Sequence, residues 1–166
     1  MALIGLLHVG CLALLAALLI GAGAQDLRTM HIANGFSLAI AGLFVVWAGV
    51  ELSAGRMSAA TLAMAIGCAV LVFAVGAAAF AVGALGGGDV KLLAAVSLFA
   101  GPARMVDFLA ITAIAGGLMG LAILVGAPLR QPAVAGPLRA RLRSGLPYGP
   151  AIAVGGLWVA ASQALS

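Results

Sequence analysis

Long apolar segments recur along the whole chain, and they constrain its fold more than any other feature. Hydrophobic residues make up 65% of the 166 residues, and charged residues make up only 7%. An α-helix needs about 20 apolar residues to cross the hydrocarbon core of a bilayer. The segments also lack the polar–apolar alternation that a membrane β-barrel requires. The sequence therefore predicts an all-α, polytopic membrane helix bundle and excludes a soluble domain.

Hydropathy predicts six transmembrane helices, with four or five as the alternative count. The expected ranges are 3–23, 35–52, 59–83, 90–101, 106–126 and 149–165. The fourth helix, 90–101, is too short to cross the bilayer alone at about 1.5 Å per residue, so it must begin in the preceding loop or pack against its neighbours. The first range ends in a segment that resembles a signal-peptide cleavage site, Ala22-Gly23-Ala24. Because no basic residue precedes it and the apolar run is long, we expect a retained helix within a single domain, 1–166.

The basic residues predict the orientation of the bundle, since cytoplasmic loops carry an excess of Lys and Arg. With the N-terminus outside, two basic residues fall on the outer side (Arg56 and Arg104) and six on the cytoplasmic side (Arg28, Lys91, Arg130, Arg139, Arg141 and Arg143). The last four of the six lie in a Pro-rich segment at about 127–148, which we expect to be a cytoplasmic loop near anionic headgroups. Asp26 and Asp89 then share the cytoplasmic face, whereas Glu51 and Asp107 lie on the opposite face.

The candidate chemistry lies in these two cytoplasmic aspartates. Asp89 follows three glycines, Gly86-Gly87-Gly88, which have access to backbone angles closed to other residues and leave room for a substrate strand. Asp26 comes at the end of the first apolar run. Two carboxyl groups that hold one water between them share a proton, so that one activates the water while the other polarises a peptide carbonyl. The pair predicts an aspartyl protease.

The residues around the two aspartates have supporting roles in this hypothesis. Arg28 and Lys91 each come two residues after an aspartate, where a cation binds a lipid phosphate, balances charge or orients the loop. Asn34 is expected to cap the second helix. The two cysteines, Cys11 and Cys68, lie in apolar segments without metal-ligand spacing, so we expect no disulfide, metal or cofactor. We interpret His8 and His31 as packing or interface residues.

These segments resemble the prepilin peptidase family of membrane aspartyl proteases, which carry a Gly-x-Gly-Asp motif. The second catalytic segment of that family is similar to Gly86-Gly87-Gly88-Asp89-Val90-Lys91-Leu92-Leu93-Ala94-Ala95. The first is similar to Asp26-Leu27-Arg28 followed by Ile32-Ala33-Asn34, where Ala33 replaces the usual proline, and the segment that opens the last helix resembles Pro147-Tyr148-Gly149-Pro150-Ala151-Ile152. The resemblance implies that Asp26 and Asp89 are the catalytic pair, with Gly86, Gly88 and Lys91 as motif residues.

The resemblance also implies a substrate and a location. Larger members have a cytoplasmic insertion with paired cysteines, which this sequence lacks, so it looks like the short, peptidase-only kind similar to those of tight-adherence (Flp-type) pili. The implied substrate is a prepilin with a basic leader, cut at the cytoplasmic face of the bacterial inner membrane just before a hydrophobic helix. We expect membrane lipids as the other partners, and no nucleic acid.

Two readings from other classes remain open. Acidic residues within a membrane also serve as proton relays, so the chain could be a small proton-coupled transporter. It could equally be a non-catalytic assembly subunit of a pilus or secretion machine. A transporter would place its acids near the middle of the bilayer, and an assembly subunit would tolerate the loss of both aspartates.

Overall fold

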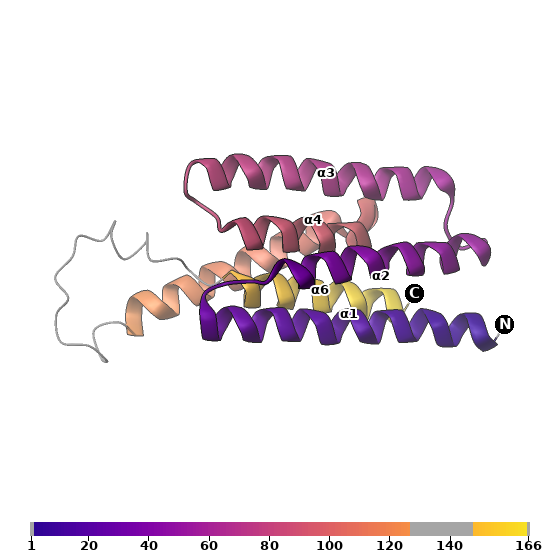
Figure 1. The fold of residues 1–166 in the computed structure, drawn as a ribbon, viewed down its shortest axis with the longest axis horizontal. Helices are drawn as coiled ribbons and strands as arrows, with labels where there is room; N and C mark the ends of the chain where they lie inside the picture. The colour runs from indigo at the N-terminus through magenta and orange to yellow at the C-terminus, as the bar shows by residue number, and fades with distance from the viewer. Residues whose placement is uncertain (1, 127–147, 166) are drawn as a thin grey trace.

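The structure is a computed structural model that describes residues 2–126 and 148–165, and within these residues it is entirely helical (Figure 1). Its helices are α1 (Ala2–Thr29), α2 (Asn34–Ser53), α3 (Ala59–Ala81), α4 (Gly87–Gly126) and α6 (Gly149–Ala164). The all-α membrane bundle expected from the sequence is therefore confirmed. The proposed Pro-rich loop at about 127–148 lies outside the described residues, except for Tyr148.

The number of helices differs from the six that hydropathy predicted. Among the described residues there are five helices, and four of them, α1 to α4, are long and apolar enough to cross a membrane. The difference lies in α4, which contains both ranges expected as separate spans, 90–101 and 106–126. A 40-residue element would measure about 60 Å if it were straight, about twice the thickness of the hydrocarbon core. The helix must therefore be broken.

The break in α4 is at Gly101, whose φ of 56° and ψ of −172° are not helical. A positive φ is readily adopted only by glycine, and Pro102 follows without an N–H to continue the helical ladder. The chain turns back there, so the two parts of α4 lie side by side (Figure 1) and Asp89 and Leu109 line one cavity. The break leaves helical carbonyl groups without their usual N–H partners. One of them, the Phe99 carbonyl, accepts a hydrogen bond of 2.7 Å from Gln163 Nε2 of α6.

The core is built where α6 packs against α1 and α4. The buried positions of α1 recur every three or four residues, as one face of a helix requires: Cys11, Leu12, Leu15, Leu19 and Ala22. Small residues allow the close approach, since a Cβ on Gly156 would lie 2.7 Å from Leu19 and 3.0 Å from Val96. Large apolar side chains on the outside, such as Leu14 and Val70, are exposed in the structure as expected for a surface that faces lipid.

Three helix ends meet at one end of the bundle. The last two turns of α1, the first turn of α4 and the first turn of α6 lie there together, next to the connection between α1 and α2 (Figure 1). That connection turns at Met30, whose φ is 52°, and is held by a hydrogen bond from Ala33 N to Gln25 Oε1 of 3.1 Å. This end of the bundle contains both Asp26 and Asp89.

Candidate active site

Asp26 is buried near the C-terminal end of α1, with 4% of its surface exposed. Its Oδ2 accepts a hydrogen bond of 2.8 Å from the backbone N–H of Gly149, the first residue of α6. The N-terminus of a helix favours a negative charge because its first N–H groups lack helical partners. The N-terminus of α6 therefore both binds Asp26 and fixes its orientation.

Gly149 has no room for a side chain. A Cβ at this position would lie 2.7 Å from Asp26 Cβ and 2.8 Å from Asp26 Oδ2. Only glycine lets the backbone of α6 come this close to the carboxyl group. The sequence marked this segment only as the opening of the last helix, and nothing in the residue pattern pointed to a contact with Asp26.

Asp89 lies in the first turn of α4 and is also buried, with 8% of its surface exposed. Its Oδ2 accepts from the N–H of Gly86 at 3.2 Å, as an acidic residue in the first turn does in a capping box. Its Oδ1 is buried and has no hydrogen-bond partner among the described residues. Because a buried acceptor without a partner is unfavourable, this oxygen is the atom of Asp89 that is open to a ligand or water.

The fold brings Asp26 and Asp89 together from two helices, close enough for their carboxyl groups to interact electrostatically. Each carboxyl group is held on one side by a single backbone N–H, from Gly149 and from Gly86 respectively. Two buried carboxylates that repel each other are unfavourable unless the charge of one of them is balanced or neutralised. The geometry therefore suits acid–base chemistry on a water.

A cavity of about 310 Å³ lies beside Asp89. It is bounded by both parts of α4 and by the start of α6, and its lining is mainly apolar apart from Asp89, Thr112 and Tyr148. Thr112 is buried, and its Oγ1 has no partner among the described residues. Sequence reasoning missed Thr112, because a single hydroxyl in an apolar helix gives no signal by itself.

The motif glycines act through close packing. A Cβ on Gly86 would lie 2.7 Å from Asp89 Oδ2, and one on Gly88 would lie 3.1 Å from Ile32 Cβ. At Gly87 the nearest atom, in Phe80, would be at an ordinary 3.5 Å. None of the three has a positive φ, so the expectation of unusual backbone angles is wrong. Gly86 and Gly88 are instead needed where Asp89 and the α1–α2 connection approach the backbone.

Within the described residues, the hydrogen bonds to the two aspartates come from backbone N–H groups and not from Lys91, Asn34 or Arg28. Lys91 Nζ donates to Asn34 Oδ1 at 2.9 Å and so links α4 to α2 at the surface. The expectation that Asn34 caps α2 is wrong, because Ala33 is the N-cap and Asn34 is already helical, with its side chain turned to Lys91. Arg28 is exposed in the last turn of α1, where a cation complements the helix dipole.

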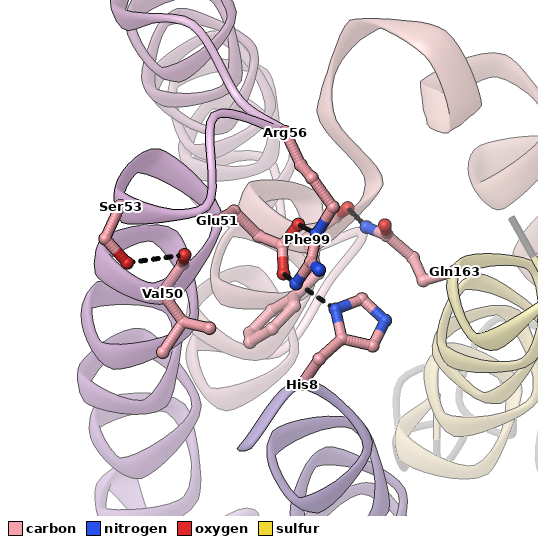
Figure 2. Close-up of polar contacts among 7 residues, drawn as sticks. All are labelled: His8, Val50, Glu51, Ser53, Arg56, Phe99 and Gln163. Carbon is pink, nitrogen blue, oxygen red and sulfur yellow. Dashed lines mark hydrogen bonds and ion pairs between the residues drawn. The ribbon is translucent and has the colours of Figure 1, made fainter. Parts of the chain in front are cut away.

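A second polar cluster lies at the other end of the bundle, around the buried Glu51 (Figure 2). Arg56 donates from Nε and Nη2 to the two carboxylate oxygens at 2.8 and 2.7 Å, and His8 Nδ1 lies 2.7 Å from Oε1. The hydrogen bond to Glu51 raises the pKa of Arg56 above its ordinary value. His8 is thus more than the packing residue expected, since it ties α1 to α2. No group of three or more His, Cys, Asp or Glu in the described part of the chain could hold a metal ion.

Comparison with known families identifies the chain. Residues 13–121 match the family model described as the type IV leader peptidase family, a range that includes both Asp26 and Asp89 and covers more than half of the chain. Comparisons with curated proteins and with solved structures gave no match. The chain is thus a helical membrane protein, and it belongs to the type IV leader peptidase family.

Proposed function

We propose that the chain is an endopeptidase that removes the short basic leader from type IV prepilin-like precursors, with Asp26 and Asp89 as its catalytic pair. One observation carries this proposal: two buried carboxyl groups from α1 and α4 interact at one end of the bundle, and Asp89 has an unpaired oxygen there. The match to the type IV leader peptidase family supports the same substrate class.

The proposed reaction is the hydrolysis of one peptide bond by one water. The ionised carboxyl group takes a proton from the water while the water oxygen attacks the scissile carbonyl carbon. The protonated carboxyl group donates a hydrogen bond to the carbonyl oxygen. The tetrahedral intermediate then collapses, the C–N bond breaks, and a proton passes to the leaving amine. The products are the leader, with a new carboxylate, and the mature pilin, with a new amino group. The N–H groups of Gly149 and Gly86 keep the two side chains in place during this sequence.

The location and subgroup are parts of the same proposal. The distribution of basic residues supports an outside N-terminus, which puts both aspartates at the cytoplasmic face of the inner membrane. The substrate would then present its leader there, with its hydrophobic helix packed in the lipid against the small-residue surfaces of the bundle. The resemblance to short, peptidase-only members favours a prepilin of a tight-adherence (Flp) system.

The test is co-expression with a tagged prepilin, scored by the gel shift that loss of the leader produces. Asp26→Asn and Asp89→Asn should each reduce cleavage by about 10²–10⁴-fold, because the amide cannot exchange a proton with the water. The matched control is Asp107→Asn, which removes an exposed carboxylate from α4 away from the site and should cleave as the wild type does.

Each other outcome contradicts part of the proposal. Cleavage by Asp26→Asn or Asp89→Asn at the wild-type rate would show that the carboxyl pair is not catalytic. An uncut prepilin in the presence of folded wild-type protein would reject the substrate. If pilus assembly then survived both substitutions, the assembly-subunit reading would replace the peptidase.

A further inference from the structure

A second and larger cavity, of about 560 Å³, lies at the end of the bundle opposite the two aspartates. Its walls come from the start of α1, the end of α2, the turn that follows, the start of α3, the break in α4 and the end of α6. Along α1, the helical rise of about 1.5 Å per residue separates His8, in this cavity, from Asp26 by about 27 Å. That separation is close to the hydrocarbon thickness of about 30 Å, so this cavity lies at the other membrane–water interface.

The charges and hydrogen-bond donors that line this cavity favour the binding of an anion. Among the described residues that line it, Glu51 is the only one with a side-chain carboxylate, and it already accepts hydrogen bonds on both oxygens, from Arg56 and, on one of them, also from His8 (Figure 2). Arg104 also lines the cavity, and within the described part of the chain it makes one long contact, from Nη2 to the Ser162 carbonyl at 3.4 Å. The described lining residues therefore include two guanidinium groups and one carboxylate, which leaves a positive charge.

Unused donors are in excess as well. Nη1 of Arg56, on a side chain that is 45% exposed, has no protein partner within the described ranges 2–126 and 148–165, and neither has the buried Nε1 of Trp47. Trp47 is 4% exposed and its indole nitrogen only donates, so it also requires an acceptor. A ligand that fits these groups is negatively charged and accepts several hydrogen bonds, as a phosphate does.

Much of the remaining wall is apolar. Trp47 and Phe99 belong to one aromatic cluster, with ring centroids 5.4 Å apart and ring planes tilted by 43°, and Leu98 and Met57 extend the apolar lining. A free inorganic ion would leave these surfaces empty, whereas an amphiphile would cover them with its chains. We propose that this cavity binds the phosphate headgroup of an anionic membrane phospholipid, with Arg104 and Arg56 on the phosphate and the upper part of an acyl chain against Trp47 and Phe99. The site does not depend on the proposed peptidase activity.

The test measures lipid binding to the full chain, purified in a non-ionic detergent, by native mass spectrometry. The probes are dioleoyl phosphatidylglycerol, dioleoylglycerol (the same chains without the phosphate) and inorganic phosphate. The wild type should retain one phosphatidylglycerol in preference to the other two probes. Arg104→Gln should weaken that binding about tenfold, since a charge-assisted contact is lost. Arg28→Gln, which removes an exposed arginine at the other end, should bind as the wild type does.

Glu51→Gln separates binding from general damage to the fold. It removes the competing negative charge and loosens Arg56, so phosphatidylglycerol should bind at least as tightly as to the wild type, whereas misfolding would weaken binding. Asp89→Asn should also bind normally, which keeps this test independent of the peptidase. Three results would each overturn the proposal: dioleoylglycerol binds as tightly as phosphatidylglycerol, inorganic phosphate binds as tightly as phosphatidylglycerol, or the Arg104→Gln variant binds phosphatidylglycerol as the wild type does.

Discussion

Gly149→Ala tests the contact that orients Asp26. The new methyl group would lie 2.7 Å from Asp26 Cβ and 2.8 Å from Asp26 Oδ2. Carbon atoms in van der Waals contact are about 3.5–4.0 Å apart, so α6 and α1 must separate locally by about 1 Å. The first obstacle is the Cβ of Asp26, which is fixed to the backbone and cannot rotate away.

The magnitude follows from this displacement. Overpacking of this kind costs about 1–3 kcal/mol, and the preference for Ala over Gly in a helix offsets at most about 1 kcal/mol of it. We expect the free energy of unfolding to fall by about 1–2 kcal/mol. A misplacement of about 1 Å at a reacting group costs about 10²-fold in rate, so prepilin cleavage should fall by about that factor.

The assays are thermal unfolding in detergent and the rate of prepilin cleavage by the same preparation. The control is Gly117→Ala in α4, where an added Cβ meets no atom within 4 Å and should leave both measurements near wild type. Wild-type stability and cleavage in Gly149→Ala would refute the close contact between α6 and Asp26. Reduced stability with normal cleavage would show that the contact is structural and does not orient a catalytic group.

Two further predictions concern packing. Gly88→Ala should lower stability by about 1–3 kcal/mol because its Cβ would press on Ile32, whereas Gly87→Ala should be nearly neutral; equal effects in thermal unfolding would contradict this distinction. Leu19→Ala, at a position with no exposed surface, should destabilise by about 2–5 kcal/mol, and the half-exposed Leu14→Ala by clearly less; similar losses for both would show that the buried face of α1 is assigned wrongly.

The chain has different chemistry at the two ends of the bundle. At one end, two carboxyl groups are held by backbone N–H groups and Asp89 has an oxygen without a partner. At the other, the carboxylate of Glu51 is saturated and the unused groups are donors. The two ends therefore differ in the ligands that we propose for them, a water and a peptide at the first and an anionic headgroup at the second.

The sequence by itself determined the class of fold and the candidate residues. Long apolar runs require membrane helices, because every backbone polar group must be satisfied within the segment in lipid. The scarcity of charged residues made Asp26 and Asp89 stand out, and the glycines before Asp89 marked it further. These conclusions depend on local composition and order, which the sequence contains in full.

Tertiary structure decided which groups meet. The contact between Gly149 and Asp26 joins α6 to α1, and the link from His8 to Glu51 joins α1 to α2; neither follows from spacing along the chain. The reversal at Gly101 likewise depends on one backbone angle; it separates the two segments that hydropathy expected at 90–101 and 106–126 and folds the second back along the first. Hydropathy and motifs report what each segment prefers, whereas a site depends on distances between segments, and these are fixed only when the helices pack.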